Sequence, residues 1–192
     1  MEPTLHNILS GSTQARAYAL RHLGVGTPEH DTAWTRFADE VQQAEDELIY
    51  RLETPSLTGI FHALDCAVGW ADAFEKGHYA EAARRFIQDL HQAGLELQIT
   101  CRMDTSYQSS PQKIPTDAGL YDGVSCLTRA LAYARFISIR QSEYAPALKR
   151  FQEEALRIQK DFIEKVSPSQ ISEEEAKLRG LNLTSNPKRG IR

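Results

Sequence analysis

Residues 54–100 decide the fold class, and they read TPSLTGIFHALDCAVGWADAFEKGHYAEAARRFIQDLHQAGLELQIT. In each half of this stretch, apolar residues recur at alternating steps of three and four, which is the spacing of one face of an α-helix. The first stripe is Leu57, Ile60, Leu64, Ala67, Ala71 and Phe74, and the second is Tyr79, Ala82, Phe86, Leu90, Ala93 and Leu97. Gly77 separates the stripes and predicts a turn. Two sustained stripes joined by a turn predict helices packed near-antiparallel.

The same spacing extends toward the N-terminus. Thr27-Pro28 is a good pair for the N-cap and first position of a helix, and Thr54-Pro55 predicts its end. The predicted core face of this long amphipathic helix is Trp34, Phe37, Val41, Ala44 and Leu48. A shorter helix is predicted from Thr13 to Leu23, with Ser12 as its N-cap and Gly24 as its end.

The second half of the chain begins with a polar stretch, Asp104 to Thr116, which has no periodicity and predicts a long loop. Thr116 or Asp117 can then cap a helix, and a further helix follows it. Their predicted core faces are Leu120, Val124, Leu127, Leu131 and Ala134 in the first, and Leu148, Phe151, Ala155, Ile158 and Phe162 in the second. We therefore expect an all-α fold, a helical bundle or short helical array of about five to six main helices, in one domain over residues 1–166.

Beyond this domain, Ser167-Pro168-Ser169 breaks the helical pattern. Ser172 and Glu175 make a capping box, so residues 167–181 are predicted to hold a linker and a short charged helix. The composition of residues 182–192 predicts a disordered tail.

Charge and hydropathy limit the kinds of partner that we expect this chain to bind. The formal net charge is -4 at pH 7, so nucleic acid is not an expected partner, because binding phosphates over a broad surface needs an excess of Lys and Arg. No apolar run approaches the roughly 20 residues that span a bilayer. The first ten residues lack the basic and apolar regions of a signal peptide. These features predict a cytoplasmic protein without membrane insertion.

The sequence contains few patterns that would indicate a metal site or a cofactor site. The three cysteines, Cys66, Cys101 and Cys126, show no CxxC spacing and are expected to be buried, reduced thiols. His62, Asp65 and Cys66 share a helical face in a spacing that metal ligands use, but structural roles are the commoner explanation. There is no glycine-rich phosphate loop and no Gly-x-Ser-x-Gly motif. We expect no cofactor and no metal site.

Residues 73–82, AFEKGHYAEA, resemble the central turn of a tetratricopeptide repeat, in which a helix, Gly, one residue, Tyr and an Ala-containing helix follow in order. The resemblance covers one hairpin, because the repeat period of about 34 residues does not recur. It implies the packing of such a hairpin and a groove that binds peptide segments of a partner.

The same hairpin also resembles the opening of HEPN-type helical ribonucleases, whose site uses an Arg and a His a few residues apart. Here Arg84 or Arg85 precedes His91 at such spacing, and seven helical positions bring Arg84 and His91 onto nearly one line, with Gln88 between them. The resemblance implies that Arg84 holds a phosphate and that His91 acts as general acid or base. The alternative is that all three simply form the solvated face opposite the Phe86-Leu90-Ala93-Leu97 stripe.

Charge is unevenly distributed between the two halves of the chain. The predicted helix from Pro28 to Glu53 is acidic, because it has only Arg36 and Arg51 as basic residues against Glu29, Asp31, Asp39, Glu40, Glu45, Asp46, Glu47 and Glu53. The later helices carry many basic residues, including Arg129 and Arg135. This division predicts either intramolecular pairing or self-association into a homo-oligomer.

Together these patterns favour a non-enzymatic helical protein that binds another protein in a groove between helices, as adaptor, chaperone, immunity-type or effector-type proteins do. The alternative hypothesis is a metal-independent ribonuclease of the HEPN type that uses Arg84 and His91.

Overall fold

The computed structural model describes residues 4–103 and 119–166. Within these ranges it contains six α-helices and no strands, which confirms the all-α bundle. The helices are α1 (Leu5–Arg21), α2 (Pro28–Leu52), α3 (Leu57–Asp72), α4 (Ala80–Thr100), α5 (Asp122–Arg140) and α6 (Ala145–Val166). None of these described helices combines the length and apolarity that crossing a bilayer requires.

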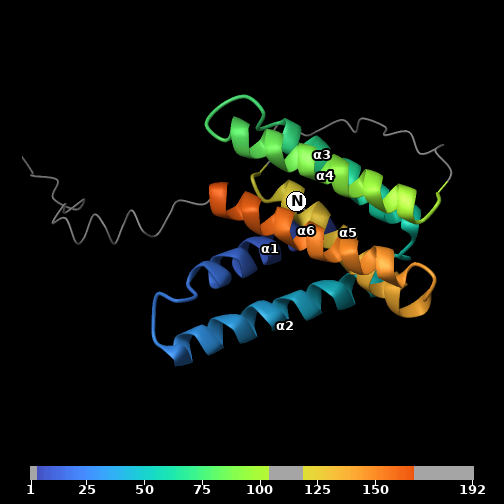
Figure 1. Cartoon of the computed structure of the whole chain (residues 1–192). Helices are drawn as coiled ribbons and strands as arrows, with labels where there is room; N and C mark the ends of the chain where they lie inside the picture. The colour runs from blue at the N-terminus through green and yellow to red at the C-terminus, as the bar shows by residue number, and fades with distance from the viewer. Residues whose placement is uncertain (1–3, 104–118, 167–192) are drawn as a thin grey trace, which may run out of the picture.

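Helix α5 is the centre of the bundle. It packs against α3, α6, α1 and α2, whereas α4 closes the far side by packing on α3 and α6 (Figure 1). Because neighbours surround it, α5 is buried on almost every side, including at the polar residues Ser125 and Thr128. The core is therefore organised around one helix and is not shared equally among six.

Small residues let α3 and α5 approach closely. A Cβ atom added at Gly123 would lie 3.1 Å from the backbone oxygen of Ala67, and one added at Gly59 would lie 2.4 Å from Cε2 of Tyr133. These two contacts pair the start of one helix with the end of the other, so α3 and α5 run antiparallel. Alanines continue the contact and are buried on both helices, at Ala63, Ala67 and Ala71 of α3 and at Ala130 and Ala134 of α5.

The predicted core faces of α3, α4, α5 and α6 are largely confirmed. Ile60, Leu64, Ala67 and Ala71 are buried in α3, and Phe86, Leu90, Ala93 and Leu97 are buried in α4. The same holds for Val124, Leu127, Leu131 and Ala134 in α5 and for Leu148, Phe151, Ala155, Ile158 and Phe162 in α6. The rings of Phe86 and Phe162 meet at a centroid distance of 4.5 Å, which joins α4 to α6.

The predicted core face of α2 is wrong, although its beginning at the Thr27 cap is confirmed. Trp34 and Phe37 are 37% and 42% exposed, and the residues that are buried are Ala38, Glu45 and Ile49. The physical reason is that α2 docks on α1 and α5 through a side that carries paired charges. Periodicity of apolar residues cannot find such a side, because it locates a core by its hydrophobic members alone.

Several predicted boundaries also need correction. Helix α1 begins at Leu5, with Thr4 as N-cap, and not at Thr13. Ser12 lies inside α1, where its hydroxyl donates to the backbone oxygen of Leu9 instead of capping a helix. Helix α3 is capped by Ser56 and ends at Asp72, before Gly77, while α5 begins only at Asp122. The end of α1 before Gly24 is confirmed, and this glycine has the positive φ of 78° that stops a helix.

Other predictions fall outside the described residues. They are the loop 104–116, the cap at Thr116 or Asp117, the linker and short helix at 167–181, and the tail 182–192.

Two glycine substitutions test the close approach of α3 and α5. Gly123→Ala is expected to destabilise the fold by about 1–3 kcal/mol, because the new methyl group must push against the backbone of α3. Gly11→Ala is the control, since nothing lies within 4 Å of a Cβ there, and it should stabilise α1 by about 0.5–1 kcal/mol. Urea unfolding measures both. Equal effects at the two positions would show that α3 and α5 are not in close contact.

Candidate functional site

The most prominent surface feature of the described bundle is an apolar face on the hairpin formed by α1 and α2. We call it the hairpin face and define it as Val25, Trp34, Phe37, Val41, Ala44 and Leu48, all of which are exposed or half-buried. The five members in α2 are spaced by three and four positions, so they lie along one side of that helix. A row of apolar side chains on the outside of a long helix is typical of a surface that another molecule covers.

The widest hollow of this face lies where α1 ends and α2 begins. It has a volume of about 410 Å³ and is lined mainly by apolar groups. The lining residues are His22, Val25, Gly26, His30, Ala33, Trp34 and Phe37. The His22 and Trp34 rings meet at a centroid distance of 5.0 Å, which joins the two helices at the floor of the hollow. A hollow of this size accommodates a few side chains.

Hydrogen bonds from backbone N–H groups to side chains fix the turn beside this hollow. Asp31 accepts from the backbone N–H of Gly24 at 2.8 Å, which ties the first turn of α2 to the end of α1. Thr27 and His30 form a reciprocal capping box at the start of α2. The turn is therefore held from both sides, and Trp34 and Phe37 project from a helix whose start is fixed.

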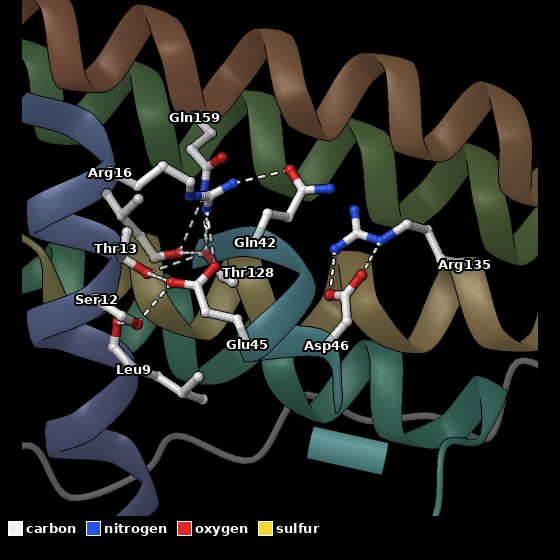
Figure 2. A network of polar contacts seen from close by, with 11 residues as sticks. Leu9, Ser12, Thr13, Arg16, Gln42, Glu45, Asp46, Thr128, Arg135 and Gln159 are labelled. Carbon is white, nitrogen blue, oxygen red and sulfur yellow. Dashed lines mark hydrogen bonds and ion pairs between the residues drawn. The ribbon is translucent and has the colours of Figure 1, made fainter. Parts of the chain in front are cut away.

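A buried polar network lies beneath the hairpin and joins α1, α2, α5 and α6 (Figure 2). At its centre, Arg16 Nη2 of α1 lies 3.4 Å from Glu45 Oε2 of α2, and the two side chains are only 8% and 2% exposed. Glu45 Oε1 also accepts from the hydroxyls of Ser12 at 2.6 Å and Thr13 at 3.2 Å. This network orients α2 by its charged side.

The contacts of Thr128 extend the network into α5 and α6. Its hydroxyl oxygen accepts from Arg16 Nη2 at 3.3 Å and from Gln159 Nε2 at 3.0 Å. Arg16 Nη1 donates to Gln42 at 3.1 Å. Burial lowers the pKa of Arg16, while the nearby Glu45 carboxylate opposes that shift. The guanidinium stays charged, since no protein environment deprotonates arginine at neutral pH.

A second set of charges joins the end of α2 to α5. Arg135 donates twice to Asp46, at 2.8 and 2.6 Å, in the forked geometry that suits a carboxylate (Figure 2). Glu53 accepts from the hydroxyl of Tyr133 at 2.6 Å and lies 3.2 Å from Nε of Arg129. The intramolecular pairing of acidic and basic residues is thus present. The alternative of self-association stays a prediction.

The exposed charges of α2 remain acidic after this pairing. Glu40 pairs with Arg36, and Glu47 pairs with Arg51, along the outside of the helix. Within the described part of the chain, Glu29, Asp31 and Asp39 have no ion-pair partner. All three lie in the first half of α2, but none of them lines the hollow beside Trp34, and Asp31 and Asp39 line a separate surface of α2 together with Arg36.

Arg84 and His91, the residues of the ribonuclease hypothesis, lie on α4 away from the hairpin face. Both are exposed, as is Gln88 between them. Glu75 lies 3.8 Å from Arg84 and partly neutralises its charge. The structure therefore places the pair on one solvent-facing side of a helix, as both sequence interpretations expect.

The residues considered for metal binding lie on α3. His62 is exposed, while Asp65 and Cys66 are half-buried, and Cys66 contacts Cys126 of α5. Across residues 4–103 and 119–166, no group of three or more His, Cys, Asp or Glu side chains is arranged to hold a metal ion.

No protein-family model, no curated protein and no solved structure matches the chain.

Removing one partner of the central ion pair tests whether it holds the hairpin. Arg16→Met is expected to destabilise the protein by about 3–5 kcal/mol, because it leaves the Glu45 carboxylate buried without a cation. Adding Glu45→Leu should restore most of that loss, since no buried charge then remains. Thermal unfolding of the single and double variants measures both effects.

The control is Arg36→Met, which removes an exposed ion pair from the same helix and should change stability little. If Arg16→Met were as mild as Arg36→Met, the buried pair would not be what orients α2.

Proposed function

We propose that this chain is a protein-interaction module that binds an amphipathic helix of another protein along the hairpin face. The observation that carries the proposal is the exposure of Trp34 and Phe37 on a helix that is otherwise well anchored. Large aromatic side chains are costly to leave in water, and they supply most of the binding energy in many interfaces.

The shape of the face favours a helical partner. Its members follow a helical spacing along α2, and the 25 residues of this helix extend for about 37 Å. A partner helix that lies along α2 can place its own apolar residues between those of the hairpin face, with one or two side chains in the hollow beside Trp34. An extended peptide would have no exposed strand edge to pair with in the described bundle.

The charge of α2 favours a basic partner over a second copy of this chain. Two copies joined along α2 would bring together two helices in which acidic residues outnumber basic ones, and like charges oppose such an association. A partner helix with Lys or Arg beside its apolar stripe would instead find a complementary field. Its association would then weaken as salt concentration rises.

Two finer features of the sequence belong to the same proposal. The α3–α4 hairpin, whose turn resembles that of a tetratricopeptide repeat, would act here as scaffold, because its apolar stripes are buried in the core. We propose that the interaction takes place in the cytoplasm, where free cysteines such as Cys66 and Cys126 are reduced at rest and disulfides form only transiently.

The ribonuclease hypothesis stays a prediction from the sequence. It requires a folded protein that cleaves RNA and a His91→Ala variant that does not. The proposed helix-binding function requires neither, so the two functions are separable by experiment.

A pair of double substitutions tests the hairpin face. Trp34→Gln with Phe37→Gln should weaken binding of the partner by about 30-fold or more, because such aromatic residues act as hot spots. The matched control is Leu95→Gln with Ile99→Gln, which changes two exposed apolar residues of α4 and should leave binding intact. Affinity purification with the wild-type protein and the two double variants identifies the partner. Titration of each of these proteins with the purified partner gives the affinities.

Equal loss of binding in both double variants, or in neither, would contradict the assignment of this face. Sedimentation of the free protein shows whether it self-associates. A dimer that the Trp34 and Phe37 substitutions dissociate would replace the proposed partner with a second copy.

A further inference from the structure

A pair of cysteines faces each other across the closest helix contact of the bundle. On either side of the pair, Gly59 lies against Tyr133, and Gly123 lies against Ala67. Gly59 and Ala67 belong to α3, whereas Tyr133 and Gly123 belong to α5, so these contacts define the register of the two antiparallel helices. The same register brings Cys66 of α3 opposite Cys126 of α5. The small residues beside them hold the two backbones near each other, and this is the condition that a disulfide between helices requires.

The two thiols are in direct contact but differ in exposure. The two thiols are within hydrogen-bonding reach of each other. Cys126 is buried, whereas Cys66 is only half-buried, so a small reagent reaches Cys66 first. The sulfur of Cys66 is thus the accessible nucleophile, and the sulfur of Cys126 is shielded from solvent.

We infer that Cys66 and Cys126 form a peroxide-reactive dithiol, in which Cys66 attacks a hydroperoxide and Cys126 then closes a disulfide between α3 and α5. This inference concerns a site on the opposite side of α5 from the buried Arg16–Glu45 network and does not depend on the proposed helix binding.

The surroundings of Cys66 favour its thiolate. The hydrogen bond from Cys126 lowers the pKa of Cys66 to about 7, against the opposing effect of burial. Arg129 of α5 and His6 of α1 lower this pKa further, while Asp65 of α3 raises it. The pKa of Cys126 is raised by that same hydrogen bond and by burial, so Cys126 keeps its proton until it reacts. A thiolate, and not a thiol, is the attacking species in such reactions.

The chemistry balances with hydrogen peroxide as the oxidant. The Cys66 thiolate attacks one peroxide oxygen, the O–O bond breaks, and the leaving hydroxide takes up a proton to become water, which leaves a sulfenic acid on Cys66. The Cys126 sulfur then attacks the Cys66 sulfur and displaces the hydroxyl group, which leaves as a second water with the Cys126 proton. Overall, two thiols lose two electrons and one peroxide is reduced to two waters. Reduction by a small thiol would begin at the exposed sulfur of Cys66.

Treatment of the full-length protein with hydrogen peroxide tests this inference. The wild-type protein should lose two free thiols and two hydrogens by intact mass, and peptide mapping should join Cys66 to Cys126. Cys101→Ser is the matched control and should react like the wild type, because Cys101 lies at the end of α4 outside the pair. The rate of thiol loss should rise with pH through about 7 and then level off, as the Cys66 thiolate forms.

Single substitutions separate the two roles. Cys126→Ser should trap the sulfenic acid on Cys66, which a dimedone adduct at that residue reports. Cys66→Ser should abolish the rapid reaction. Retention of all three thiols in the wild type under peroxide that oxidises a free small thiol would overturn the inference, and so would a mapped disulfide that includes Cys101. The mapping uses the wild-type chain, so it decides the question even if a variant fails to fold.

Discussion

The buried ion pair between Arg16 and Glu45 is the interaction on which the arrangement of the hairpin depends. Two opposite charges removed from water are tolerated only when they meet each other and further hydrogen-bond partners, and here Ser12, Thr13 and Thr128 supply those partners. Glu45 therefore has to face α1, where Ser12, Thr13 and Arg16 lie. Because Glu45 fixes which side of α2 points inward, the apolar stripe through Trp34 and Phe37 is left facing outward.

The sequence predicts the parts of this fold that hydrophobic burial alone determines. The stripes of α4 and α6 lie in the core as expected, because each is the longest apolar stripe of its helix. In α2 the apolar side and the inward side differ. The signal that could have revealed this was the acidic residue Glu45 beside the apolar stripe, together with Arg16 in the preceding helix, which is its ion-pair partner. Such pairing depends on tertiary contacts and is not encoded in the periodicity of one helix.

The central position of α5 was likewise not predictable from the hydrophobic pattern of its sequence. Its pattern resembles that of any amphipathic helix, yet glycine and alanine on its second side allow α3 to pack there as well. Small residues give a weak hydrophobic signal but permit the closest backbone approach. The same approach places Cys66 against Cys126, a pairing that the spacing of the cysteines in the sequence does not suggest. The close approach of α3 and α5 thus explains both the burial of α5 and the proposed reactivity of the cysteine pair.

The most direct test of this account is the exposure of Trp34 in the free protein. Trp70 is the other tryptophan, so a Trp70→Phe variant reports on Trp34 alone. If the charged side of α2 faces inward, acrylamide should quench Trp34 fluorescence readily in the native state, and a bound partner helix should protect it. A Trp34 that is shielded from acrylamide in the free monomer would contradict the account, because it would mean that α2 buries its apolar stripe after all.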